Sequence, residues 1–214
     1  MITITIIVIT CLVSFLAFSN EKLKEDLIFY PPAISKHKQW YRFVTCGFIH
    51  ADIGHLVFNM FSLYVIGRHV EERFIEIFDT QGKILYIALY LTALVACLIP
   101  TYNKNKDNYY YRSLGASGAV SAVVFAFMFF YPTMGIGMMF IPVYIPGFIF
   151  GPIYLIISSI LDKRGGGNIN HSAHIWGAIY GVIFVIITCY FLSSYRPVTE
   201  FVEMVKAYIS AHFS

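Results

Sequence analysis

A serine between two glycines is the first feature of this sequence that could do chemistry. Ser117 lies in the stretch Gly115-Ala116-Ser117-Gly118, where a polar segment (101–113) meets an apolar run (116–131). Glycine has no side chain, so the backbone can bend here and other groups can approach the hydroxyl closely. Small residues also pack membrane helices together, so the stretch by itself is first interpreted as a packing patch.

His174 makes a chemical role for Ser117 more specific. It lies near the start of the last long apolar run (172–192). An imidazole beside a serine hydroxyl makes a base and a nucleophile. A triad would add a carboxylate behind the histidine, but the acidic residues lie outside the predicted membrane segments, except Glu71, which caps the end of one. If the chain is a hydrolase, we therefore expect a Ser117–His174 dyad.

Two further polar residues are candidates for stabilising an oxyanion. His55 and Asn59 are four residues apart, so they share one face of a helix. Polar side chains are costly in a membrane and usually face a bundle interior or a cavity. Both can donate hydrogen bonds, and the backbone N–H of Ser117 is a third donor. Hydrogen bonding between helices is the alternative role, above all for Asn59.

The composition indicates what kind of protein positions these residues. Of the 214 residues, 58% are hydrophobic and 13% are charged, about half the usual charged share of roughly 25% in soluble domains. We therefore expect an integral membrane protein. The net charge of +3 is modest and does not point to nucleic acid. The four cysteines are widely spaced without a metal-ligand pattern, and nothing calls for a metal or an organic cofactor.

Six apolar segments predict an all-α bundle of six transmembrane helices over residues 1–193. Several of them approach the length that spans a bilayer. The segments are 1–18, 54–68, 83–100, 116–131, 147–161 and 172–192. The first run lacks the basic start of a signal peptide, so we interpret it as a retained helix. A charged connector is expected at 70–82.

Three other segments complete the predicted organisation. The long stretch 20–42 is rich in aromatic residues, which fits a segment lying partly in the lipid–water interface. The segment 132–146 is apolar but broken by prolines and glycines, and the helix that follows is the least regular and a candidate moving part. The tail 194–214 is amphipathic and predicts an interfacial helix over 199–213.

The predicted fourth and sixth helices each carry a line of small residues. Gly115, Gly118 and several alanines follow one side of the fourth helix, and Gly177 and Gly181 form a GxxxG pattern in the sixth. Such faces let two backbones approach closely. Contact between them would bring Ser117 towards His174.

Taken in order, these residues resemble the rhomboid family of intramembrane serine proteases. The resemblance covers about residues 42–192. The motifs that carry it are Gly115-Ala116-Ser117-Gly118, His50, His55 with Asn59, His174-Ile-Trp-Gly177 with Gly181, Arg42 three before Thr45, and Glu71 with Arg73.

The resemblance implies roles for these residues. Ser117 matches the nucleophile, His174 the general base, His55 and Asn59 the side chains of the oxyanion hole, and His50 a residue that shapes the loop near the site. It also implies a membrane-embedded first loop at about 20–45, and a gate and cap made by the fifth helix and the loop 162–170. Substrates would be transmembrane proteins of the same lipid bilayer. We expect a multi-pass protein of a bacterial inner membrane with a cytoplasmic N-terminus.

Two features depart from the family pattern. An aromatic residue often lies four positions after the nucleophile and stacks on the histidine, whereas this chain has Ser121. We predict that the Ser121 hydroxyl lies near His174, or that Phe125 or Trp176 packs there instead. The second departure is charge. A cytoplasmic N-terminus places only five of the fifteen basic residues inside, and the positive-inside rule favours the opposite orientation.

Two other functions compete with proteolysis. A catalytically silent rhomboid-like protein could bind membrane proteins, although such a protein would not need both Ser117 and His174. A small transporter could line a pathway with His55, Asn59 and His174, but there are no inverted repeats and few charges in the apolar segments. A zinc metalloprotease would need an HExxH motif, and the sequence has none.

Overall fold

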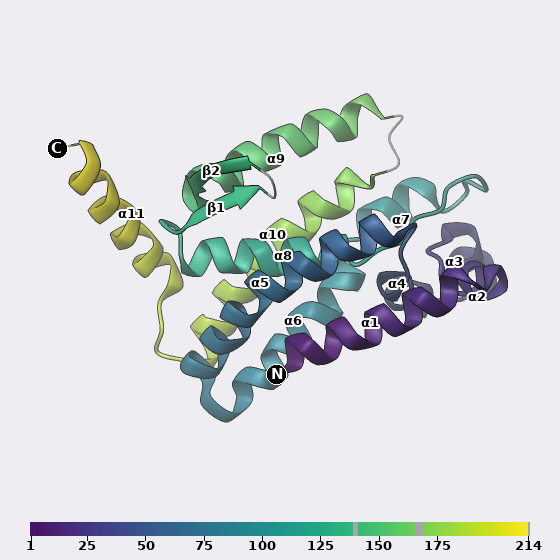
Figure 1. Cartoon of the computed structure of the whole chain (residues 1–214), viewed down its shortest axis with the longest axis horizontal. Helices are drawn as coiled ribbons and strands as arrows, with labels where there is room; N and C mark the ends of the chain where they lie inside the picture. The colour runs from purple at the N-terminus through teal and green to yellow at the C-terminus, as the bar shows by residue number, and fades with distance from the viewer. Residues whose placement is uncertain (139–140, 166–168, 214) are drawn as a thin grey trace.

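The computed structural model describes residues 1–138, 141–165 and 169–213, which form a helical bundle with one small β-hairpin (Figure 1). Gly166 and Gly167 of the loop 162–170 lie outside the described residues. The elements are α1 (Ile2–Phe18), α2 (Glu21–Leu27), α3 (Pro31–His37), α4 (Arg42–Thr45), η1 (Cys46–Phe48), α5 (Ile53–Phe78), η2 (Asp79–Gln81), α6 (Gly82–Ala96), α7 (Ile99–Asn105), α8 (Ser117–Phe130), β1 (Gly135–Met138), β2 (Ile141–Pro146), α9 (Gly147–Arg164), α10 (His171–Leu192) and α11 (Pro197–Phe213).

The six apolar segments coincide with α1, α5, α6, α8, α9 and α10. Within the described residues, two segments are long and apolar enough to cross a membrane, Ile53–Asn105 and His171–Leu192. The helices Ile2–Phe18 and Ser117–Phe130 are apolar but shorter. The number of membrane crossings therefore stays a prediction, whereas the positions of the helices agree with the sequence pattern.

The second long helix extends further than the sequence predicted. The segment 70–82 was expected to be a connector, but α5 continues to Phe78. Its charged end is rich in good helix formers, and Arg73 pairs with Glu76 one turn later at 2.9 Å. Charge at the end of a membrane helix thus marks where the apolar part ends, not where the helix ends.

Glu71 joins this end of α5 to the start of α1. Its carboxylate accepts the backbone N–H groups of Ile2 at 2.7 Å and Thr3 at 2.9 Å, and the Thr3 hydroxyl at 2.7 Å. The Thr3 hydroxyl also contacts the Tyr86 hydroxyl on α6 at 3.0 Å. An acidic group at a helix N-terminus satisfies the free N–H groups there. Glu71, Thr3 and Tyr86, the Glu71 cluster, thereby fasten α1, α5 and α6 together.

The predicted first loop folds into the short helices α2, α3 and α4. Arg42, which is buried, donates to the carbonyls of Glu25 at 2.7 Å and Ile28 at 2.8 Å. Phe29 and Ser113 exchange two backbone hydrogen bonds of 3.0 and 3.1 Å. This bridge ties the loop to the chain that leads into Ser117.

The segment 132–146 is the main departure from the all-helical prediction. Its described residues form the antiparallel hairpin of β1 and β2, with Gly135 opposite Pro146 and Gly137 opposite Tyr144. Prolines break a helix but are tolerated in strands without a second neighbour. The hairpin leads directly into α9, which is continuous although Pro152 lies inside it. Motion of α9 stays a prediction.

The helices α8 and α10 form the most extensive helix pair in the described residues. Figure 1 shows them crossing in the middle of the bundle, with α5 beside α8 and α9 along another side. A side chain at Gly177 would collide with the carbonyl of Gly118, and one at Gly181 with the carbonyl of Ala122. The two backbones therefore touch, as the small-residue pattern predicted.

The tail forms α11 at the far end of the bundle from α2 and α3 (Figure 1). Phe201 stacks on Phe129 of α8 with ring centroids 5.2 Å apart. Tyr208 contacts Phe148 of α9 at 5.7 Å. The aromatic side of the amphipathic tail thus packs on the bundle.

Candidate functional site

The Ser117 hydroxyl and the His174 imidazole are in hydrogen-bond contact. Oγ of Ser117 lies 2.7 Å from Nε2 of His174, and the two residues are on α8 and α10. The backbone contacts at Gly177 and Gly181 permit this approach. A larger residue at Gly177 or Gly181 would push α8 and α10 apart and so separate the hydroxyl from the imidazole.

The chain enters α8 through a bend that requires glycine. Gly115 has a φ of 112°, a conformation that residues with side chains rarely adopt. A Cβ at this position would also lie 2.6 Å from Cε1 of His55. The N–H of Gly115 donates to the carbonyl of Cys46 at 2.9 Å, which holds the bend against η1. At Gly118 a side chain would collide with the sulfur of Cys97.

Ser117 is the first residue of α8. The residue before it, Ala116, provides no side-chain cap for the helix. The first N–H groups of a helix have no partner within it and carry partial positive charge. The N–H of Ser117 therefore belongs to a set of donors at the mouth of the helix, beside its own hydroxyl.

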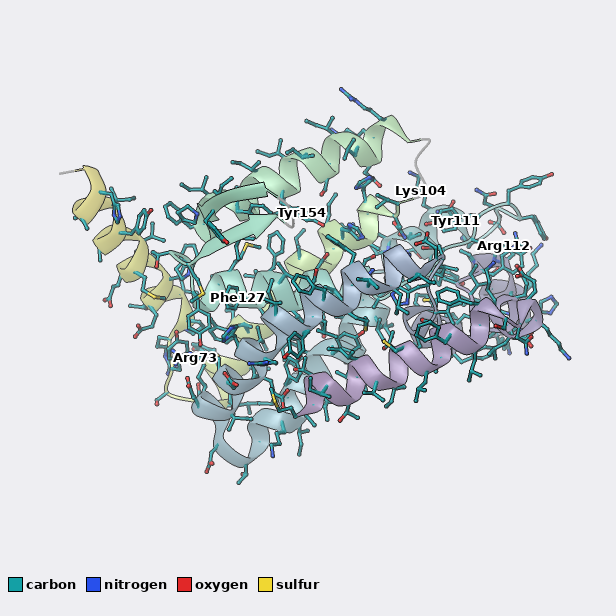
Figure 2. All side chains as sticks on the ribbon, viewed as in Figure 1. Arg73, Lys104, Tyr111, Arg112, Phe127 and Tyr154 are labelled. Carbon is teal, nitrogen blue, oxygen red and sulfur yellow. The ribbon has the colours of Figure 1, made fainter. Side chains whose placement is uncertain are left out.

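A cavity of about 510 Å³ opens at this point. Ser117, His174, His55 and Asn59 all line it, together with apolar side chains of α6 and of the first loop. Arg112 and Asp52 add charged groups to the lining. Figure 2 shows Arg112 towards the end of the bundle occupied by α2 and α3. The cavity is therefore mainly apolar, with polar groups gathered around the hydroxyl.

His55 and Asn59 hold defined positions in this cavity. Asp52 caps α5 by accepting the N–H of His55 at 2.8 Å. The Asn59 side chain, 2% exposed, donates from Nδ2 to the His55 carbonyl at 2.9 Å. This bond uses one of the two hydrogens on Nδ2, so a second donor remains on the amide.

His50 lies behind the cavity and contacts the residue that precedes Ser117. Its Nδ1 is 3.0 Å from Oγ of Ser14 on α1, and its Nε2 accepts the N–H of Ala116 at 3.4 Å. The Ser14 hydroxyl donates to the Phe48 carbonyl at 2.9 Å. Since that bond uses its only hydrogen, Nδ1 of His50 must carry a proton and donate to Ser14. His50 thus connects α1 to the start of α8.

Ser121 is buried, as expected of a residue near the site. The group in contact with His174 is a different one, which the sequence analysis did not predict. The hydroxyl of Tyr154, on α9, lies 3.2 Å from Nδ1 of His174. The side chain of Ser121 lies near that phenol rather than taking its place. Phe125 packs on the Tyr154 ring with centroids 5.7 Å apart, and Trp176 is 46% exposed, so packing of either ring on His174 stays a prediction.

One sequence signal could have identified Tyr154. The inner face of α9 is Gly147, Gly151, Tyr154 and Ser158, at steps of four, three and four residues. On a helix with small residues on its packed face, the single large polar side chain has to reach a neighbouring helix. Its partner lies on a different helix, so spacing within α9 could not name it.

The site as described offers hydroxyl, imidazole, amide and phenol groups. Among the residues that the structure describes, no group of three or more His, Cys, Asp or Glu side chains could hold a metal ion. An imidazole nitrogen at 2.7 Å from a hydroxyl can accept its proton as the oxygen attacks an electrophile. The neighbouring N–H donors suit the negative oxygen that such an attack creates.

Comparison with known proteins finds similar sequences over most of the chain. The model of the Rhomboid domain matches residues 37–191. The chain is 36% identical over 153 residues to RHOMBOID-like protein 12, mitochondrial, of Arabidopsis thaliana, covering 65% of this chain and 44% of that protein. It is 31% identical over 155 residues to Rhomboid-like protein 11, chloroplastic, of the same plant, covering 68% of this chain and 51% of that one.

The chain thus spans about half the length of the curated relatives it matches. Both relatives are described as proteins of plant organelles, so the comparisons do not support the expected bacterial inner membrane. The resemblance seen in the motifs is confirmed by the match over 37–191. This chain belongs to the rhomboid family, whose members are embedded in membranes and are generally serine proteases.

Proposed function

We propose that this chain is an intramembrane serine endopeptidase that cleaves transmembrane segments of other proteins. The observation that carries the proposal is the 2.7 Å contact between Ser117 Oγ and His174 Nε2 at the wall of a cavity within the bundle. A silent family member would have no need of a base in contact with a hydroxyl. The contact is what a nucleophile and its general base require.

In the first half of the reaction, Ser117 is acylated. Oγ attacks the carbonyl carbon of the scissile peptide bond while its proton passes to Nε2 of His174. The carbonyl oxygen becomes an oxyanion in a tetrahedral intermediate. When that intermediate collapses, the C–N bond breaks and His174 returns the proton to the departing amine. The product is an acyl ester on Ser117.

The oxyanion needs donors that are in place before the reaction. The N–H of Ser117 lies at the start of α8, and the side chains of His55 and Asn59 line the same cavity. Removing one such donor typically costs about 2.7–4 kcal/mol of transition-state stabilisation. In a largely apolar cavity, neutral donors achieve this without the cost of a buried charge.

In the second half, water releases the acyl group. His174 takes a proton from a water molecule, which attacks the ester carbon, and then returns a proton to Oγ of Ser117. A cavity of about 510 Å³ has room for water molecules beside a peptide segment. Asp52, Arg112 and Ser113 give its lining polar character, which favours hydration inside an otherwise apolar bundle.

The substrate must present an extended peptide to Ser117. A peptide in a regular helix has its carbonyls hydrogen-bonded and shielded, so cleavage is expected near the end of a substrate helix, where the chain can unwind. We further propose that the cavity opens on the side of the membrane opposite the N-terminus, which would lie in the cytoplasm or its equivalent. This orientation follows the family and not the distribution of basic residues.

Proteolysis is tested with the full chain in liposomes and a model transmembrane substrate. Wild type should cleave it, whereas Ser117→Ala and His174→Ala should not. Ser62→Ala is the matched control, because the Ser62 hydroxyl donates to the Phe58 carbonyl in its own helix at 2.8 Å. Labelling by a fluorophosphonate probe should follow the same order. Equal cleavage by all four proteins, or none by any of them, would contradict the proposal.

Orientation is tested with single cysteines in a background without the four native ones. Tyr110 is 95% exposed next to the segment that enters α8, so Tyr110→Cys should react with an impermeant maleimide from outside the cell. Glu203→Cys in α11 should react only after the membrane is opened. The reverse pattern would show that the basic residues, and not the family, indicate the topology.

A further inference from the structure

Tyr154 extends the contact between serine and histidine to a third helix. Its Oη lies 3.2 Å from Nδ1 of His174, while Nε2 of the same ring lies 2.7 Å from Ser117 Oγ. A hydroxyl, an imidazole and a phenol therefore form a line from α8 through α10 to α9. Figure 2 shows Tyr154 on the side of α9 that faces this pair of helices.

The two contacts constrain which ring nitrogen of His174 carries the proton. To accept a proton from Ser117, Nε2 must present a lone pair, so in the neutral ring the hydrogen is on Nδ1. Nδ1–H then needs an acceptor in a partly buried place. Among the described residues the Tyr154 oxygen fills that position, and it can accept there while donating its own hydrogen elsewhere.

Two neighbouring hydroxyls are candidates for that second partner. The hydroxyls of Ser121 on α8 and Ser158 on α9 lie near its Oη. Both serines are buried, at 8% and 4% exposed. The phenol thus lies within a small set of neutral hydroxyl groups. No charge has to be buried to satisfy it, which is an advantage over the carboxylate of a soluble triad.

We propose that Tyr154 is a positioning residue for the reaction described above. It accepts the hydrogen bond from Nδ1–H of His174, which keeps the lone pair of Nε2 directed at Ser117. It also supports the imidazolium that forms when Nε2 takes the serine proton. The inference rests on the proposed function, because the tautomer matters only if His174 acts as a base.

The location of Tyr154 makes this arrangement depend on α9. The inner face of α9 packs on α8 and α10, whereas its outer face is apolar and exposed at Ile153, Ile156, Ile157 and Ile160. Gly151, one turn before Tyr154, faces Phe125 and Met128 of α8. An outward shift of α9 would remove the phenol from His174 without touching Ser117. Docking of α9 is therefore required for a fully competent histidine.

Tyr154 does not line the cavity that holds Ser117 and His174. A substrate in the cavity therefore contacts the histidine but not the phenol. This separates a positioning role from a binding role in kinetic terms. Loss of the phenol should lower kcat, while KM for the substrate should not change.

The main test compares wild type with Tyr154→Phe in the full chain. The phenylalanine keeps the ring against Phe125 and Phe150 but removes Oη. We expect kcat and the rate of fluorophosphonate labelling to fall about three- to tenfold, the effect of one neutral hydrogen bond. In ¹⁵N NMR of histidine-labelled protein, the His174 signal should move from the Nδ1–H tautomer towards the Nε2–H tautomer. His174→Gln assigns that signal.

Two matched controls separate positioning from packing. Phe125→Leu alters the ring next to Tyr154 and should leave the tautomer unchanged. At Gly151 a Cβ would lie 3.5 Å from the Phe125 ring, an ordinary contact, so Gly151→Ala should behave as wild type. Gly151→Leu should push α9 outward and reproduce the tautomer change of Tyr154→Phe.

The outcomes distinguish this inference from the proposed function. If wild type neither cleaves nor is labelled, the proposed function fails, yet the NMR signal still reports whether Tyr154 sets the tautomer. If wild type is active and Tyr154→Phe matches it in kcat and tautomer, the positioning role is overturned. A rise in KM with unchanged kcat would also overturn it, since that result assigns Tyr154 to substrate binding.

Discussion

Two buried polar clusters lie at opposite ends of α5 and have different hydrogen-bond patterns. His55 is in the first turn of this helix and Glu71 lies sixteen residues later, about 24 Å along it. At the Glu71 end, one carboxylate accepts three hydrogen bonds of 2.7–2.9 Å, and Glu71 is not among the residues that line the cavity beside Ser117. At the Ser117 end, hydroxyl, imidazole and amide groups line a cavity of about 510 Å³.

The comparison shows how a membrane bundle uses polar groups in two ways. Around Glu71 both carboxylate oxygens accept hydrogen bonds from α1, so the cluster contributes stability. Around Ser117 the N–H groups at the start of α8 and one hydrogen on the Asn59 amide have no bond within the described chain. Unused donors beside a cavity can bind the negative charge that develops during a reaction. Leaving them unpaired lowers the stability of the fold, as is common at functional sites.

The largest effect expected from this comparison is at the contact of α8 and α10. In Gly181→Leu the new side chain would collide with the backbone of Ala122 and force the helices apart. A misplacement of 1 Å costs roughly 100-fold in rate, and a leucine needs more than that, so fluorophosphonate labelling should fall below detection. Ile183→Leu, on the exposed side of α10, is the control and should label normally. Normal labelling of Gly181→Leu would mean that the seam does not position the site.

Removal of an unused donor should have the next largest effect. In Asn59→Ala we expect kcat to fall about 100-fold, because one oxyanion donor is lost. Asn105→Ala is a close control, since Asn105 donates from Nδ2 to the Thr101 carbonyl at 2.9 Å, the same bond that Asn59 makes to His55. Both variants lose this bond, but only Asn59 lines the cavity with Ser117. Similar kcat values for the two would assign Asn59 to helix packing.

The part of the site that could be predicted from the sequence is the part encoded by local spacing. The interval between Gly177 and Gly181, and the small residues after Gly115, indicate a close helix pair, and that pair brings Ser117 to His174. The contact between Tyr154 and His174 could not be predicted in this way, although the spacing within α9 singles out Tyr154. Its partner is on another helix, and a tyrosine in an apolar helix is usually assigned to the membrane interface.

The same limit explains the errors in the fold. The segment after Arg68 was expected to be a connector because it is charged, yet Glu71 is buried by a partner 68 residues away in sequence, Thr3. Residues 132–146 contain prolines and were expected to be irregular, but their pairing in a hairpin is a contact between segments. The composition of a segment indicates which secondary structure it favours by itself. It does not indicate which distant segment will pack against it and change that preference.

Substitution in the Glu71 cluster should lower the free energy of unfolding and leave the reactivity of Ser117 unchanged. Glu71→Gln presents an amide group to the N–H donors of Ile2 and Thr3, so part of this network is lost. We expect the free energy of unfolding to fall by about 1–3 kcal/mol. Labelling of Ser117 per folded molecule should be unchanged. Glu72→Gln, whose side chain is exposed, should shift stability by no more than about 0.5 kcal/mol.

The smallest predicted effect tests whether the two ends of the molecule are independent, because α1 contributes to both. Thr3 belongs to the Glu71 cluster, and Ser14, eleven residues later on the same helix, accepts from Nδ1–H of His50. His50 in turn accepts the N–H of Ala116 beside Ser117. Ser14→Ala removes one neutral hydrogen-bond partner of His50, so labelling should slow by about three- to tenfold.

The control for Ser14→Ala has to separate α1 from the hydroxyl itself. Ser62→Ala removes a serine hydroxyl that donates to a carbonyl within α5, and should not slow labelling. If Thr3→Val, which disrupts the Glu71 cluster, slows labelling as much as Ser14→Ala does, then α1 transmits changes from one end to the other. If only Ser14→Ala slows labelling, His50 acts locally through Ala116, and the Glu71 cluster and the Ser117 site are independent of each other.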